Sequence, residues 1–152
     1  METQAIKLLA MAHLIVLSMW GGVVATEAVI EIYPFRRREL HAAAIRFHYW
    51  IDLLIELPLV LAVIATGVAL LFVIETVTPL HLVLIGFGGA AVAINLFCIA
   101  VVVKRGQRLE RSADEGPLWR ASRMVLACFA TGLLCAGGAA VLGFWLAFER
   151  MG

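Results

Sequence analysis

The chain has 152 residues, of which 63% are hydrophobic and only 15% are charged, and its mean hydropathy is +0.99. A water-soluble domain of this size needs a larger polar surface, so the composition excludes an ordinary soluble protein. The net charge of +1 gives no reason to expect a nucleic-acid partner. The three cysteines form no Cys-x-x-Cys pair, which argues against a disulfide oxidoreductase.

Four apolar stretches make up most of the chain, and each is long enough to cross a lipid bilayer. A helix needs about 20 residues to span a hydrocarbon core about 30 Å thick. We therefore predict an all-α fold, in which residues 1–152 form a single integral membrane domain built as a bundle of four transmembrane helices. The predicted helices cover about 5–32, 47–74, 80–103 and 122–148.

Basic residues predict the orientation of these helices. They gather in the first and third connections and are absent from the second. Because cytoplasmic loops of membrane proteins are enriched in lysine and arginine, we expect the first and third connections in the cytoplasm and both termini outside. The basic residues of these two connections are Arg36, Arg37, Arg38 and Arg46, and then Lys104, Arg105, Arg108, Arg111, Arg120 and Arg123.

The first two predicted helices carry ionisable residues that membrane spans rarely contain. Inserting an ionised carboxylate near the bilayer centre costs roughly 2.5–3.5 kcal/mol. Spacings of four residues keep these side chains on one face of each helix, and antiparallel packing brings the two faces to similar depths. The acidic cluster consists of Glu27 and Glu31 on the first helix and His48, Asp52 and Glu56 on the second.

Pro58 follows this cluster closely in the sequence. It has no backbone N–H and cannot donate to the carbonyl of Leu54, four residues earlier. Irregular backbone at membrane depth is tolerated where it lines a polar cavity, although proline kinks also occur where no ligand binds. Pro58 is therefore compatible with a polar site beside the acids but does not require one.

Three explanations of the acidic cluster remain open. A divalent transition metal (Fe, Mn, Zn or Cu) would be held by these five residues, with Glu31 as a ligand at the rim or as an entry group, and with a supporting hydrogen bond from Asn95. Its role would be metal transport or membrane redox chemistry. Protonation of the buried carboxylates would instead give a proton pathway or cation-coupled transport. The third explanation is pairing with Arg36–Arg38 or Arg46 of the first connection, because no basic residue is embedded within the predicted helices.

Small residues concentrate in the third and fourth predicted helices. Small side chains let helices approach closely in lipid, so we expect these helices to pack within the bundle, in a homo-oligomer or against a partner in a membrane complex. A role as an accessory subunit of such a complex is therefore a further alternative. The glycines concerned are Gly86, Gly88, Gly89, Gly132, Gly137, Gly138 and Gly143.

Two histidines, His13 and His81, lie away from the acidic cluster within short recognisable motifs. These motifs are His13 before Trp20-Gly21-Gly22, then Tyr33-Pro34 and the arginine run, Arg46-Phe47, Thr66-Gly67 and Pro79-Leu80-His81. The pattern, which covers about the first half of the chain, resembles CopD-type copper-resistance membrane proteins and HemJ-type protoporphyrinogen oxidases. The resemblance implies a four-helix bundle that handles a metal or a porphyrin. It also implies an alternative function, a membrane oxidoreductase in which His13, with His81 or another group opposite, binds heme b.

Overall fold

The computed structural model describes residues 2–73, 76–111 and 115–149. Nearly all of the residues in these ranges are helical and none of them forms a strand, which confirms the all-α prediction. Four helical segments are long and apolar enough to cross a membrane: Gln4–Phe35, Arg38–Val73, Pro79–Arg111 and Glu115–Gly143. The protein is therefore an integral, multi-pass membrane protein that folds as a four-helix bundle.

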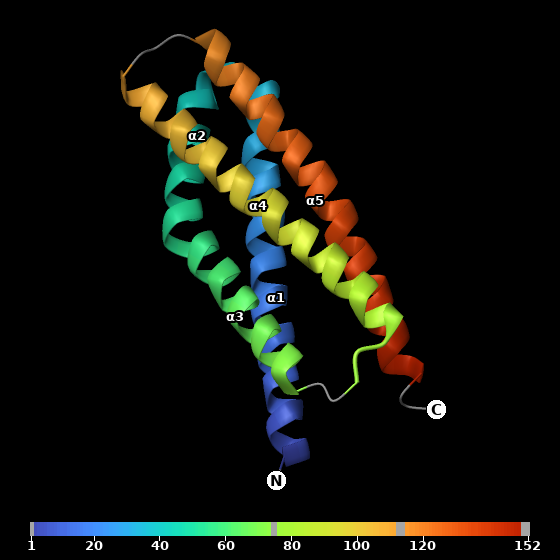
Figure 1. The fold of residues 1–152 in the computed structure, drawn as a ribbon. Helices are drawn as coiled ribbons and strands as arrows, with labels where there is room; N and C mark the ends of the chain where they lie inside the picture. The colour runs from blue at the N-terminus through green and yellow to red at the C-terminus, as the bar shows by residue number, and fades with distance from the viewer. Residues whose placement is uncertain (1, 74–75, 112–114, 150–152) are drawn as a thin grey trace.

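The bundle consists of two pairs of long helices (Figure 1). Helix α1 (Glu2–Ile32) packs against α3 (Leu57–Val73), and α4 (Pro79–Arg111) packs along α5 (Glu115–Glu149). The short helix α2 (His41–Ile51) contacts α4 and so joins the two pairs. Side chains from all four spans therefore meet in the part of the bundle where α2 lies.

The connection between the first two spans lies at the same end of the bundle as the end of α4 and the start of α5 (Figure 1). It contains two 3₁₀ turns, η1 (Tyr33–Phe35) and η2 (Arg38–Leu40). The side chains of Arg36–Arg38, Arg108 and Arg111 are exposed there, and we call this the basic end. The start of α1 and the end of α3 lie at the opposite end (Figure 1).

The second span changes its helical form within the acidic cluster. Between α2 and α3, residues Asp52–Glu56 form a π-helical turn, η3, in which the N–H of Leu57 donates to the carbonyl of Asp52, five residues earlier. Pro58 explains this local widening, because its ring would clash with the carbonyl four residues before it in a regular α-helix. Single π-helical turns of this kind occur frequently at functional sites.

Helix α4 is longer than the sequence predicts. It continues past Val103 to Arg111, so that Arg105 lies in a helix and not in a loop. The buried residues of α4 recur at spacings of three and four as far as Arg105, whose side chain is only 1% exposed. The predicted loop position of Arg105 is wrong, because the helical period continues beyond the last run of apolar residues.

An apolar layer closes the bundle on the side of the acids that faces the start of α1 and the end of α3. It consists of Trp20 from α1, Val60 and Val63 from α3, and Ala91 from α4, none of them more than 7% exposed. Because Trp20 precedes Glu27 on α1 and Val60 follows Glu56 on the second span, the layer is further from the basic end than the acids are.

The glycines of α4 and α5 differ in their surroundings. A Cβ added at Gly132 would lie 3.7 Å from Ile94, and one added at Gly138 would lie 3.2 Å from Phe87, so both glycines serve the α4–α5 contact. The other five have no such neighbour within 4 Å among the residues that the structure describes: Gly86, Gly88, Gly89, Gly137 and Gly143. An oligomer or partner contact through these small faces stays a prediction.

Candidate metal centre

All five residues of the acidic cluster are buried inside the bundle. Their exposed fractions range from 0% to 2%, although they belong to spans whose outer surfaces are apolar and exposed. Helical spacing accounts for this placement, because it keeps Glu27 and Glu31 on the inner face of α1 and the other three residues on the inner face of the second span. The structure therefore brings the predicted residues together.

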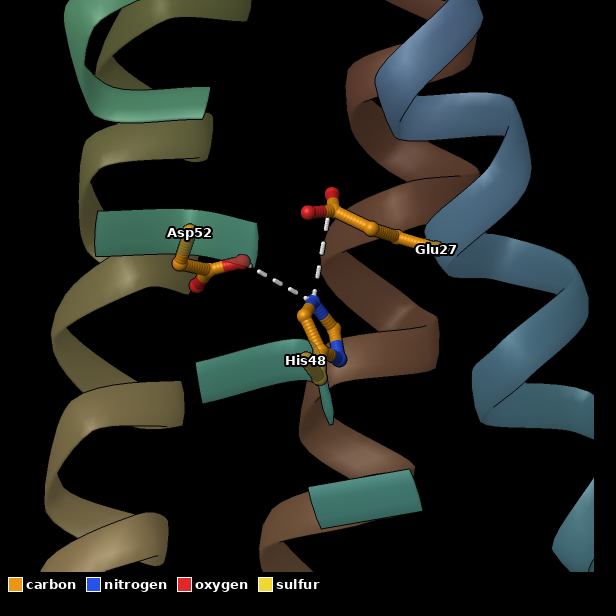
Figure 2. A group of neighbouring side chains, drawn as sticks. All are labelled: Glu27, His48 and Asp52. Atoms are coloured by element: carbon orange, nitrogen blue, oxygen red, sulfur yellow. Dashed lines mark ion pairs between the residues drawn. The ribbon is translucent and has the colours of Figure 1, made fainter. Parts of the chain in front are cut away.

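His48 lies between two carboxylates, as Figure 2 shows. Its Nε2 atom is 3.2 Å from Asp52 Oδ1 and 3.9 Å from Glu27 Oε2. One side-chain atom from each of the three residues lies within 4.8 Å of the other two. Metal–ligand bonds to nitrogen and oxygen are about 2.0–2.2 Å long, so the ligand atoms of one ion are at most about 4.4 Å apart. A small contraction of this group is therefore enough for the three side chains to hold a single ion.

Glu31 has a partner of its own, which is the buried guanidinium of Arg105. The two form a bidentate pair, with Nη1 2.5 Å from Oε1 and Nη2 2.9 Å from Oε2. Paired in this way, Glu31 is ionised and its charge is neutralised within the chain. Arg105 therefore occupies both carboxylate oxygens of Glu31. Glu31 lies on the side of His48 that faces away from Glu27 and Asp52.

The Glu31 carboxylate also fixes the orientation and the proton position of His48. Its Nδ1 atom is 2.8 Å from Glu31 Oε2, and an ionised carboxylate only accepts hydrogen bonds, so Nδ1 is the donor. Arg105 Nη2, 3.2 Å from the same nitrogen, is then a neighbouring donor. In the neutral imidazole this leaves the lone pair of Nε2 directed towards Glu27 and Asp52. Metal-binding histidines are typically held by a carboxylate in this way.

Glu27 and Asp52 differ from Glu31 because the ring of His48 is their only basic neighbour within 4 Å among the described residues. None of their four carboxylate oxygens has a hydrogen-bond partner among the described residues, although both side chains are 0% exposed. Burying an ionised carboxylate without a partner costs several kcal/mol. A proton or a bound cation must therefore accompany these two groups.

A chain of polar contacts continues from Glu31 towards the basic end. Arg105 Nη1 donates to Ser122 Oγ at 2.7 Å, and this hydroxyl is 2.9 Å from His41 Nε2. The ring of His41 stacks on Trp119 with its centroid 3.8 Å away and an interplanar angle of 17°. We call Glu31, Arg105, Ser122 and His41 the polar seal. Its four residues come from α1, α4, α5 and α2 and are at most 6% exposed.

Glu56 lies on the other side of the centre, next to the apolar layer. Its Oε1 atom accepts hydrogen bonds from Asn95 Nδ2 at 2.6 Å and from Trp20 Nε1 at 3.3 Å. Asn95 therefore acts through Glu56, while its own Oδ1 atom has no partner among the described residues. These donors set Glu56 apart from Glu27 and Asp52, to which the structure gives none.

The arginines named in the third explanation of the acidic cluster are not the ones that pair with it. Arg36–Arg38 and Arg46 are exposed, and Arg37 pairs with Glu39 at 3.6 Å. The expectation that no internal ion pair is available is also wrong, because Arg105 provides one. The period of α4 could have revealed it: Asn95, Cys98, Val102 and Arg105 are spaced by three, four and three residues.

The two remaining histidines have local hydrogen-bond partners. His13 Nδ1 is 2.7 Å from the hydroxyl of Thr66, which donates to the carbonyl of Ala62, so the histidine is the donor in this contact. His81 lies near the start of α4, with Nδ1 2.6 Å from Thr78 Oγ1. Neither contact points to a porphyrin, and heme binding by His13 and His81 stays a prediction.

Comparison with known proteins provides no relative for this chain. No family model matches it, and no curated protein or solved structure matches it significantly. The resemblance to CopD-type and HemJ-type proteins therefore stays a prediction from short motifs. Two features therefore characterise this protein: the integral membrane bundle and the buried group of Glu27, His48 and Asp52, which could hold a metal ion.

Proposed function

We propose that this protein is a membrane metalloprotein that binds one divalent transition-metal ion between Glu27, Asp52 and the Nε2 atom of His48. The observation that carries the proposal is the complete burial of two carboxylates whose four oxygens have no hydrogen-bond partner in the described part of the chain. A bound cation provides the missing partner for both groups at once.

The charges around the centre fit a divalent ion. Arg105 neutralises Glu31, so the ion has to offset Glu27 and Asp52, which carry two negative charges. Glu56 is stabilised separately by the N–H groups of Asn95 and Trp20. A monovalent ion would leave one of the two unpartnered carboxylates uncompensated.

The chemistry of the ligands narrows the choice of ion. Two carboxylates and one imidazole form a mixed oxygen and nitrogen site, which suits Mn²⁺, Fe²⁺ or Zn²⁺. Soft Cu⁺ prefers thiolate and thioether ligands, and none of the three ligand residues has one. We therefore propose Mn²⁺, Fe²⁺ or Zn²⁺ as the class of ion.

The number of ligands favours a catalytic or transported ion over a structural one. Structural sites are usually closed by four protein ligands, whereas three protein ligands leave a position for water or substrate. The resemblance to CopD-type and HemJ-type proteins implies a bundle that handles a metal or a porphyrin. We propose a role in metal transport or membrane redox chemistry, with the basic end in the cytoplasm according to the positive-inside rule.

Metal analysis of the purified protein tests the proposal directly. Protein extracted in mild detergent without chelator, dialysed against Mn²⁺, Fe²⁺ or Zn²⁺ and then freed of unbound metal, is expected to retain about one ion per chain. The isosteric variants Glu27→Gln and Asp52→Asn should retain roughly tenfold less, because each removes one charged ligand. Glu39→Gln is the matched control, since Glu39 is 64% exposed and contacts only a surface arginine. Metal-free wild type, or equal retention in the variants and wild type, contradicts the proposal.

A proton pathway is the second candidate, and the two buried carboxylates without a hydrogen-bond partner in the described chain favour it. In this candidate, Glu27 and Asp52 carry protons in place of a metal. Proton uptake into vesicles that is lost in Asp52→Asn, together with metal-free wild type, would favour this function over the first.

A further inference from the structure

The geometry points to the Glu31–Arg105 ion pair as the gate through which a metal ion enters and leaves the centre from the basic end. This inference rests on the proposed function, because the ion that passes the gate is the ion that Glu27, His48 and Asp52 bind. It assigns to the polar seal a role in the rate of exchange, separate from the affinity that the ligands determine.

The polar seal occupies the space between the centre and the basic end. Glu31 contacts His48 on one side, and Ser122 and His41 continue the seal on the other. All four spans contribute a side chain to it, and each of these side chains is buried. While the ion pair is formed, its guanidinium and carboxylate fill the polar route to His48.

The opposite route is closed by apolar side chains. Beyond Glu56, Trp20 lies with Val60, Val63 and Ala91 in the apolar layer. Apart from the indole N–H, which is bonded to Glu56, these side chains offer no polar atom to an ion. A dehydrated divalent ion would lose its ligands there without replacement, which makes this direction very costly. In this conformation, exchange therefore occurs through the polar seal.

Arg105 is held in a manner that allows it to open. Its bonds to Glu31 and Ser122 are all made by the terminal nitrogens, while Nε has no partner among the described residues. Arginine side chains near the ends of membrane helices readily extend towards the interface, and the exposed arginines of the basic end lie there. Once released, Glu31 presents a carboxylate beside His48 that can receive the arriving ion.

Exchange kinetics test the gate with a change that preserves charge. Arg105→Lys keeps the positive charge but cannot form the bidentate pair. With Zn²⁺ as the probe, the purified protein is mixed rapidly with metal to measure binding, and the loaded protein is mixed with excess chelator to measure release. We expect both rate constants to rise roughly tenfold, while Kd stays within about threefold of the wild-type value, because the ligands are unchanged. Arg108→Lys, an exposed position one turn further along α4, should leave both rates unchanged.

The double variant Glu31→Gln, Arg105→Gln also preserves net charge and repeats the test if the lysine variant does not fold. Binding and release rates within about twofold of the wild-type values in a folded variant would overturn the gate. Faster release without faster binding would also overturn it, because that result means that the variant has lost affinity for the metal. Val60→Ala in the apolar layer should not accelerate exchange, and acceleration equal to that of Arg105→Lys would place the route at the other end. A wild-type protein that binds no Zn²⁺, Mn²⁺ or Fe²⁺ overturns the proposed function itself. A wild-type protein that binds metal, with exchange rates that do not change when the polar seal is altered, overturns only the gate.

Discussion

Glu27 and Glu31 lie one helical turn apart on α1 and are equally buried, yet their surroundings are opposite. Glu31 shares both oxygens with Arg105 and accepts a further bond from His48. Glu27 has no hydrogen-bond partner in the described chain and faces Asp52, which has none either. The comparison shows that burial alone does not define a ligand site. The carboxylates that the chain leaves uncompensated are the ones that require something from outside it.

The largest effect is expected from removing the partner of Glu31. Arg105→Ala leaves an ionised carboxylate buried and unpaired, which should lower the free energy of unfolding by about 3–5 kcal/mol. Thermal or denaturant unfolding in detergent measures this loss. Arg108→Ala, on the exposed face of the same helix, should change the value by less than about 0.5 kcal/mol. A loss below about 1 kcal/mol for Arg105→Ala would mean that Glu31 is not ionised in the folded protein.

The fold could be predicted from the sequence because hydropathy belongs to each segment separately. Four apolar stretches are sufficient to predict four spans, and spacings of four residues are sufficient to place Asp52 and Glu56 on the same face as His48. These inferences need no knowledge of how one helix is rotated against another. For this reason the residues of the acidic cluster could be predicted from the sequence.

The partners of these residues could not be predicted in the same way. A hydropathy window ends α4 at its first charged residues, whereas backbone hydrogen bonds continue the helix and turn Arg105 inward. The contacts of Ser122 with His41 and of Trp20 with Glu56 join residues 81 and 36 positions apart. Such pairs depend on the rotation and tilt of the helices, which the sequence does not state directly.

The same substitution on either side of His48 should have opposite effects on the metal-free protein. Glu27→Gln removes a buried carboxyl group without a hydrogen-bond partner, and with it the cost of burying its charge or of protonating it, so the free energy of unfolding should rise by about 1 kcal/mol. Glu31→Gln removes the partner of Arg105 and should lower it by about 2 kcal/mol. Unfolding of both variants in the presence of chelator measures the difference. Equal signs would show that the two carboxylates do not differ in the way their contacts indicate.

Added metal should stabilise the wild-type protein and these two variants to different extents. At about 100 times its Kd, a divalent ion that binds only the folded state stabilises wild type by about 2.7 kcal/mol. Glu27→Gln should lose most of this gain, because it loses a charged ligand. In Glu31→Gln, the ligand set of Glu27, His48 and Asp52 is retained. A gain retained in Glu27→Gln would count against Glu27 as a ligand.

A smaller effect is expected at a close contact between α4 and α2, next to Arg105. Gly106 follows Arg105 on α4, and a Cβ added there would lie 2.6 Å from Cδ2 of Tyr49 on α2, too close for the ring to stay in place. Gly106→Ala should therefore separate α2 from α4 and lower the free energy of unfolding by about 1–2 kcal/mol. Gly88→Ala is the matched control on the same helix, because its added Cβ has no described neighbour within 4 Å. If the two variants unfold alike, Tyr49 turns aside without strain, and the polar seal does not depend on this contact.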